Sequence, residues 1–274
     1  MNRAACARET LEILERGNYT RADGVVVDVR AAQAAAVAGT VGHRPESLPP
    51  VPAISGGAHI TVTRATTMEA LARLSAVPGG RLGCLNFASA KNPGGGFLGG
   101  AQAQEEALAR SSGLYPCLFT QQAIYDENRA HRSLLYLDRA IYSPGVPFFR
   151  DDAGNLLAAP YFADVITCAA PNAGAVASNQ PADLPQVAPT LARRAEFVLR
   201  VAAHHGVKRL VLGAWGCGVF RNDPRQVARV FADLLAAGQP WHGAFDEVIF
   251  AVFDASKNAG TYLAFAEMFL SDPP

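Results

Sequence analysis

Short apolar runs along this chain alternate with longer stretches in which apolar residues recur every three or four positions. The runs have the length of buried β-strands, and the stretches have the period of amphipathic helices. Strands are expected at residues 24–29, 58–63, 81–89, 161–172 (stopping at Pro171), 208–212 and 247–254. Helices are expected at residues 3–16, 30–38, 66–76, 102–111, 190–205, from 224 onward and near the C-terminal end. This alternation predicts an α/β sandwich with helices on both faces of a central sheet.

The C-terminal third has the clearest burial pattern. The run EVIFAVFD (247–254) is almost continuously apolar, as in a strand that is buried on both faces. Asp223 and Pro224 suit the N-cap and the first position of a helix. The apolar stripes of the last two helices are Val227, Val230, Phe231, Leu234 and Leu235, followed by Tyr262, Phe265, Ala266, Phe269 and Leu270. We expect these stripes to face the core.

Three segments have neither period and are expected to lie outside regular elements. Residues 43–57 form a loop rich in proline and glycine, and are the best candidate boundary if an N-terminal extension exists. Residues 140–161 are expected to be a long loop or a hairpin. Residues 172–189 are expected to be a loop before helix 190–205, which Gly206 ends in the usual helix-stop position.

Composition and charge narrow the functional classes. The 274 residues carry 24 Lys plus Arg and 24 Asp plus Glu, so nothing suggests general binding to nucleic acid or to anionic membranes. The first 20 residues lack the apolar segment of a signal peptide, and no run reaches the ~18 apolar residues of a membrane span. The five cysteines are scattered without a CxxC pair. We therefore expect a cytoplasmic protein with reduced thiols.

Two glycine-rich loops, at 93–101 and 213–219, each follow a predicted strand. Loops at the carboxyl ends of such strands line ligand clefts, so both loops are expected at one cleft. The first loop formally matches G-x-G-x-x-G, but it lacks the later acidic residue of a dinucleotide site, and no Walker A lysine is present. Glycine-rich backbone can direct N–H groups at phosphate oxygens, and two such loops suit a diphosphate. The alternative is that the glycines only permit tight turns and close packing.

Glu105 and Glu106 stand near the start of the helix that follows the first loop. Acids there stabilise the helix dipole, and Glu106 could pair with Arg110, so a purely structural role is one alternative. Adjacent helical residues point ~100° apart, so these two carboxyl groups cannot flank one bond from opposite sides. One of them could face a reacting bond while the other contacts a neighbouring hydroxyl or supports the loop.

The first loop and its acids carry a recognisable signature. Three glycines, seven residues and then Gln-Glu-Glu, together with GAWGCGVF in the second loop, resemble the bacterial-type poly(ADP-ribose) glycohydrolases, which carry a macrodomain core. The resemblance implies a macrodomain-like three-layer α/β sandwich, with a mixed central sheet, helices on both faces and an N-terminal helical extension. It further implies a single catalytic domain over residues 1–274, with residues 1–50 packed on the core as that extension.

The resemblance also implies an activity and its residues. The family cleaves the ribose–ribose O-glycosidic bond of poly(ADP-ribose) and releases ADP-ribose. By this resemblance Glu106 is the catalytic acid and base, and Glu105 hydrogen-bonds ribose hydroxyls as the second residue of the catalytic pair. The implied substrate-binding residues are Asn92, Gly94, Gly95, Gly96, Gln104, Gly216, Gly218, Val219, Phe220 and Phe253, where Phe253 is a candidate neighbour of the adenine or a plain core residue. No cofactor or metal is expected.

Two other functions stay open at this point. A macrodomain that binds ADP-ribose without cleaving it needs the glycine loops but not the paired acids, so Gln104-Glu105-Glu106 favours an enzyme. A hydrolase that removes single ADP-ribose marks is the other alternative. The expected partners are poly(ADP-ribose) or ADP-ribosylated proteins as substrate and ADP-ribose as product. The expected setting is a cytoplasmic monomer that reverses ADP-ribosylation in the DNA damage response.

Overall fold

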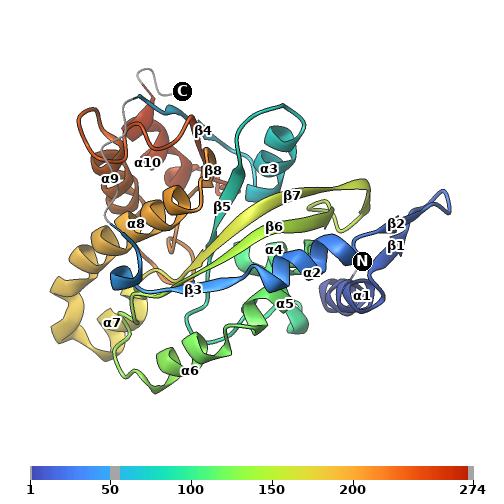
Figure 1. Cartoon of the computed structure of the whole chain (residues 1–274). Helices are drawn as coiled ribbons and strands as arrows, with labels where there is room; N and C mark the ends of the chain where they lie inside the picture. Colours follow the sequence, from blue (N-terminus) through green and yellow to red (C-terminus); the bar gives the residue numbers. More distant parts are fainter. Residues whose placement is uncertain (1, 50–55, 271–274) are drawn as a thin grey trace.

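A seven-stranded mixed sheet forms the centre of the protein, whose computed structural model describes residues 2–49 and 56–270 (Figure 1). The strands in spatial order are β3 (Val41–His43), β6 (Ala140–Arg150), β7 (Leu156–Cys168), β5 (Leu82–Phe87), β8 (Arg209–Leu212), β9 (Glu247–Ala251) and β4 (His59–Thr63). The pairs β3–β6 and β6–β7 are antiparallel. All neighbours from β7 to β4 are parallel, so their carboxyl ends meet at one edge.

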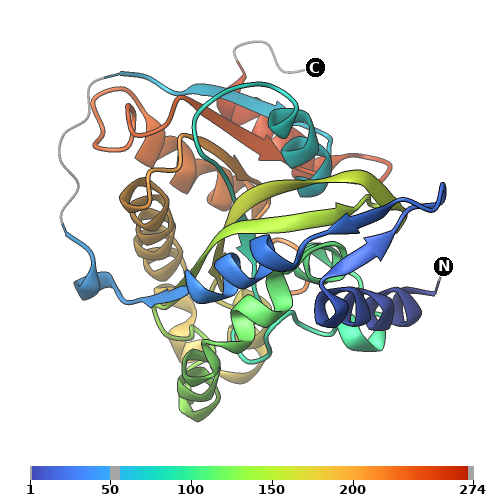
Figure 2. The ribbon, with the colours of Figure 1, turned by 45° about the vertical axis from the view of Figure 1, so that its right-hand side comes forward.

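Helices cover both faces of this sheet. One face packs against α8 (Val187–His204), α9 (Pro224–Leu235) and α10 (Gly260–Phe269). The other face packs against α2 (Arg30–Ala38), α3 (Thr67–Ser75), α4 (Gln104–Ser111), α5 (Leu114–Phe119) and α6 (Gln122–Ala130). The expected three-layer sandwich with a mixed sheet is therefore confirmed (Figures 1 and 2).

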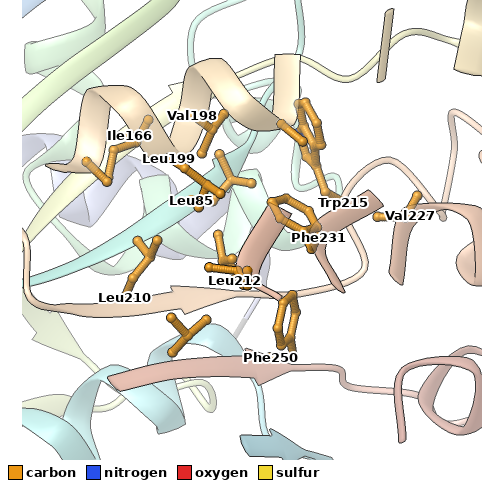
Figure 3. Close-up of a cluster of buried hydrophobic side chains, with 14 of the residues drawn as sticks. Leu85, Ile166, Val198, Leu199, Leu210, Leu212, Trp215, Val227, Phe231 and Phe250 are labelled. Atoms are coloured by element: carbon orange, nitrogen blue, oxygen red, sulfur yellow. The ribbon is translucent and has the colours of Figure 1, made fainter. Parts of the chain in front are cut away.

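The core on the α8–α9 face fixes the second glycine loop. Figure 3 shows Leu210, Leu212 and Phe250 of the sheet facing side chains from α8 and α9, with Trp215 near the end of β8. Trp215 is fully buried, and its indole Nε1 donates to the carbonyl of Cys168 at 2.9 Å. The loop after β8 is thereby tied to the end of β7 by one buried, well-packed side chain.

The N-terminal segment adds one helix, a small hairpin and an edge strand. Helix α1 (Arg3–Arg16) ends at Gly17, whose φ of 75° allows the left-handed helix stop. It is followed by a hairpin of β1 (Asn18–Thr20) and β2 (Val26–Asp28), beside the far end of the β6–β7 hairpin (Figure 2). Strand β3 then pairs with β6, so this segment contributes a strand to the central sheet. The short helix η1 (Pro45–Ser47) lies in the candidate boundary 43–57, of which residues 50–55 lie outside the described residues.

The structure differs from the sequence-based expectation mainly in short helices. Residues 140–161 belong to a hairpin of long strands, which was one of the two alternatives. The loop expected at 172–189 is wrong, because it contains α7 (Ala173–Asn179), η3 (Pro181–Gln186) and the first residues of α8. Helix α7 buries only Val176 and is started by the Asn172 side chain, which accepts from the N–H of Ala175 at 3.0 Å. Such a short helix has no apolar stripe to detect. Helices α5 and α6 were likewise not predicted.

The apolar stripe of the last helix is only partly buried. Phe269 and Leu270 are half-exposed, whereas Tyr262, Phe265 and Ala266 are buried as expected. No helix among the described residues is long and apolar enough to cross a membrane.

Candidate active site

A cavity of about 350 Å³ lies at the carboxyl ends of the parallel strands. The first glycine loop, the start of α4 and the second glycine loop form its walls. The expectation that both loops line one cleft is therefore confirmed. The lining includes Phe87, Ser89, Asn92, Gly95, Gly96, Gln104, Glu105, Glu106, Trp215, Gly216, Gly218, Val219 and Phe220.

Gln104 fixes the start of α4 to strand β5. Its Oε1 accepts from the N–H of Phe87 at 2.8 Å, and its Nε2 donates to the carbonyl of Leu85 at 2.8 Å. The same Nε2 also donates to Thr67 Oγ1 at 3.1 Å. Because the side-chain amide is engaged on three sides by protein groups, it suits a positioning role better than direct contact with a ligand.

Glu105 lines the cavity from a buried position and is only 2% exposed. Its Oε2 accepts from the N–H of Ser89 at 2.6 Å, and its Oε1 accepts from Asn86 Nδ2 at 3.3 Å. Burial raises the pKa of Glu105 to about 8, against the opposing effect of these hydrogen bonds, and the negative charge of Glu106 raises it further. The protonated form of Glu105 is therefore favoured at neutral pH, so this carboxyl group can donate a proton in a hydrogen bond.

Glu106 is the more exposed of the two acids. It is half-buried, and its Oε1 accepts from the N–H of Gly96 at 3.0 Å. It forms no ion pair with Arg110, which instead donates to the carbonyl of Ala101 at 2.7 Å. The alternative role of Glu106 as the partner of Arg110 is therefore wrong.

Gly95 allows both carboxyl groups to approach the first loop. Its φ is 58°, a left-handed conformation that other residues adopt at a cost. A β-carbon at this position would lie 2.4 Å from Glu106 Oε1 and 3.1 Å from Glu105 Oε2. The two acids thus converge on one side of the Gly95 backbone. Because the two acids are adjacent in the helix, they were not expected to flank one bond from opposite sides, and the structure agrees with this expectation.

The second glycine loop is held by a buried asparagine. Gly216 has a φ of 73°, and a β-carbon there would lie 2.5 Å from Asn222 Nδ2. Asn222 Nδ2 donates to the carbonyl of Pro171 at 2.9 Å and to that of Gly216 at 3.1 Å. Gly218 faces open space, and Val219 is 81% exposed. The loop is therefore held by hydrogen bonds at Gly216 and open to the surroundings at Gly218, an arrangement that suits an anion-binding loop.

Two of the expected site residues lie outside the cavity lining. Gly94, with a φ of 69°, is a buried residue of the first loop, and a β-carbon there would meet Phe97 and Tyr115. Phe253 is 67% exposed, so the alternative that it is a plain core residue is wrong. The other ten expected residues all line the cavity.

Asn86 and Ser89 support Glu105 but were not predicted from the sequence. Asn86 is fully buried in β5 and also donates to Thr167 Oγ1 at 3.1 Å. One polar residue inside the apolar run LGCLNF was the available signal, because a buried amide needs a partner.

Cysteine and metal chemistry have little support at this site. Burial and the charge of Asp223 raise the pKa of the Cys217 thiol to about 12, which disfavours the thiolate. Among the described residues, no group of three or more His, Cys, Asp or Glu side chains is arranged to hold a metal ion.

Comparison with known proteins gives consistent matches. The family model for the catalytic domain of microbial-type poly(ADP-ribose) glycohydrolase (PARG) matches residues 7–151. The chain is 49% identical to the solved PARG of Thermomonospora curvata, over 97% of this chain and 99% of that one, with a TM-score of 0.92. For the same organism's enzyme bound to the inhibitor ADP-HPD, the identity is 50%, the coverage 97% and 99%, and the TM-score 0.91. The PARG of Deinococcus radiodurans in complex with ADP-ribose is 50% identical over 87% of this chain and 97% of that one, with a TM-score of 0.79. None of the curated proteins matches.

Proposed function

This chain belongs to the microbial-type poly(ADP-ribose) glycohydrolase family and is a glycoside hydrolase; we propose that Glu106 is the general acid and base with which it cleaves poly(ADP-ribose). One observation carries the assignment of Glu106. Of the two adjacent acids, Glu105 is buried with both oxygens engaged, whereas Glu106 is half-exposed in the cavity wall. A general acid must reach the leaving oxygen, which favours Glu106.

The terminal ADP-ribose unit would bind with its diphosphate along the second glycine loop. Gly216, Gly218 and Val219 line the cavity, where their backbone N–H groups would bind the phosphate oxygens, and Phe220 lines it beside them. The terminal ribose would lie between Phe220 and the first loop, within reach of Glu106. The adenine would lie near Phe253, whose exposed ring is available for stacking.

In the reaction, the protonated Glu106 would donate its proton to the bridging oxygen as the glycosidic C–O bond breaks. The leaving ribose departs as a hydroxyl, and positive charge develops on the anomeric carbon of the terminal ribose. Glu106, now a carboxylate, takes a proton from a water molecule whose oxygen attacks that carbon, which regenerates the acid.

Glu105 would act beside Glu106 as a hydrogen-bond donor. Its protonated form can donate to a ribose hydroxyl while Ser89 and Asn86 hold the carboxyl group in place. Keeping Glu105 protonated also limits the acid pair to one negative charge. Asn92 would hydrogen-bond a ribose hydroxyl, and Gly94–Gly96 would allow the ribose to approach the first loop, with Gln104 holding the start of α4.

The variant Glu106→Gln tests this assignment. Glutamine can still accept from the N–H of Gly96 but cannot exchange a proton, so the single-turnover rate on poly(ADP-ribose) should fall by about 10²–10⁴. Affinity for ADP-ribose, measured by titration calorimetry, should stay within a few fold. Glu105→Gln is the matched variant and should lose some of both rate and affinity. Parental turnover by Glu106→Gln would show that another group is the acid.

The organisation and setting of the enzyme are also part of this proposal. Residues 1–274 would form one catalytic domain with residues 1–50 packed on its core, which is supported by the β3–β6 pairing and by a 2.5 Å hydrogen bond from Thr10 Oγ1 to the Arg110 carbonyl. The enzyme would act as a cytoplasmic monomer on poly(ADP-ribose) or ADP-ribosylated proteins in the DNA damage response. Its five free cysteines fit a reducing compartment. Light scattering, cell fractionation and ADP-ribosylation levels after DNA damage test these points.

A further inference from the structure

A second groove is lined by residues that neighbour those of the active-site cavity. It has a volume of about 500 Å³ and is lined by α7 and by residues near the starts of α8 and α9. Phe220 lines the cavity, and the next residue, Arg221, lines this groove. The N–H of Gly174 in α7 donates to the carbonyl of Phe220 at 2.9 Å, so the wall of the groove is bonded to the wall of the cavity. We call this hollow the Arg221 groove.

Arg221 is held at the junction by its backbone and its stem. Its φ is 56°, which is unusual for a residue other than glycine, and its N–H donates to the carbonyl of Gly218 at 3.0 Å. The stem crosses Gly174, where a β-carbon would lie 2.9 Å from Arg221 Cδ. The chain therefore adopts a disfavoured conformation that fixes this arginine beside the cavity.

The guanidinium of Arg221 has no carboxylate within ion-pair distance among the residues that the structure describes. The acid that shares the groove, Asp223, caps α9 instead: its Oδ1 accepts from the N–H groups of Arg225 at 2.7 Å and Gln226 at 3.4 Å. The groove thus presents a cation, and the acid in its lining already caps a helix.

The wall that separates the cavity from the groove is rigid. The ring of Tyr136, which also has a left-handed backbone with φ of 63°, lies 5.9 Å from that of Phe220. The fully buried Arg194 of α8 donates to the carbonyls of Leu135 at 2.9 Å and Tyr136 at 3.1 Å. Asn172, which caps α7, donates to the Tyr136 hydroxyl at 3.4 Å. A ligand that passes Phe220 would therefore meet a preformed surface rather than a mobile loop.

We propose that the Arg221 groove binds the second ADP-ribose unit of the polymer, with that unit's diphosphate against the Arg221 guanidinium. The inference rests on the proposed function, because it requires the terminal unit to occupy the cavity with its ribose beside Phe220. The leaving ribose would then emerge near Phe220, and the next residue along the chain, Arg221, lines this groove. The volume suits a nucleotide-sized ligand, and a guanidinium recognises phosphate oxygens through paired N–H donors.

This arrangement divides recognition between two kinds of contact. The terminal unit is held mainly by backbone N–H groups in a cavity, whereas the second unit meets an exposed cation. Affinity for free ADP-ribose should therefore depend little on salt, and affinity for the polymer should weaken as salt rises.

The test replaces Arg221 without disturbing its backbone. Asparagine tolerates the left-handed conformation and removes the charge, and Arg221→Lys keeps the charge. Polymer binding is measured by fluorescence polarisation with labelled poly(ADP-ribose) in the Glu106→Gln background, so that no turnover is required. Arg221→Asn should weaken polymer binding by about 5- to 20-fold, the size of a charge-assisted contact at an exposed site, and Arg221→Lys by less. Free ADP-ribose should bind within twofold of the parent.

Arg225→Ala is the control for loss of charge alone. Arg225 is a nearby cation that pairs with Glu267 at 2.8 Å and lies outside the lining of the groove. The proposal is overturned if Arg221→Asn binds polymer like its parent, if Arg225→Ala weakens binding equally, or if ADP-ribose and polymer lose the same factor. Failure of the proposed function has a separate signature, in which the unmodified enzyme releases no ADP-ribose from the polymer.

Discussion

Replacing Gly95 by alanine is the sharpest probe of how the first loop positions the catalytic carboxyl group. The φ of Gly95 is 58°, and alanine costs about 1–2 kcal/mol more than glycine in this left-handed conformation. The added β-carbon would also lie 2.4 Å from Glu106 Oε1, where real β-carbons essentially never come within 3.0 Å. The carboxyl group or the loop must therefore move by at least about 0.6 Å.

That movement acts on the one hydrogen bond that holds Glu106 to the loop. The bond from the N–H of Gly96 to Glu106 Oε1 is 3.0 Å long, and a hydrogen bond to a charged group is worth about 1.5–3 kcal/mol. Together with the backbone term, we expect Gly95→Ala to lower the free energy of unfolding by about 2.5–5 kcal/mol. A displacement approaching 1 Å at a catalytic group costs about 10²-fold in rate.

The assay combines three measurements on Gly95→Ala. Single-turnover release of ADP-ribose from poly(ADP-ribose) gives the rate, calorimetry gives the affinity for ADP-ribose, and urea unfolding gives the stability. Gly99→Ala is the matched control, because Gly99 lies in the same loop and a β-carbon there would meet no atom within 4 Å. It should behave like the parent. A folded Gly95→Ala enzyme with a rate within threefold of the parent would refute the assignment of the reacting carboxyl group to this position.

Three further predictions concern buried or half-buried groups around the sheet. Because the pKa of Glu105 is raised to about 8 from 4.5, stability should fall by about 3–5 kcal/mol as pH rises from 4.5 to 8, and Glu105→Gln should flatten this slope in urea titrations. Burial and the neighbouring His43 lower the pKa of His205 to about 4 from 6.5. The free energy of unfolding should therefore fall as pH drops from 6.5 to 4, by about 1–2 kcal/mol once the partial exposure of the ring is allowed for. His205→Gln should remove this acid loss, and an unchanged slope would contradict the assignment. Trp215→Phe removes the hydrogen bond to the Cys168 carbonyl and should weaken ADP-ribose binding by about 3- to 10-fold in calorimetry. Parental affinity would mean that this hydrogen bond does not position the second loop for binding.

Much of the fold follows from local sequence signals. Helices α1 and α2 have the expected bounds, because apolar residues recur at helical spacing and a glycine follows each of them. The parallel strands were detectable as apolar runs, which is how strands buried on both faces appear in a sequence. Helices α5, α6 and α7 were not predicted; α5 and α7 are only six and seven residues long, and neither α5 nor α6 has a side-chain N-terminal cap that would mark its start.

For the candidate site too, local sequence signals predicted some features and not others. The sequence by itself determined that two glycine loops and a pair of acids lie at the carboxyl edge of the sheet, because each follows directly from a strand or begins a helix. It could not decide which acid is buried, because Glu105 and Glu106 have the same chemistry and adjacent positions. Tertiary structure decided this: Asn86 and Ser89, from β5 and the residues after it, hold Glu105 in a buried position at the cavity, while the bare backbone of Gly95 leaves room for Glu106 in its wall. Contacts between residues far apart in the chain set solvation and proton affinity, and no local pattern records them.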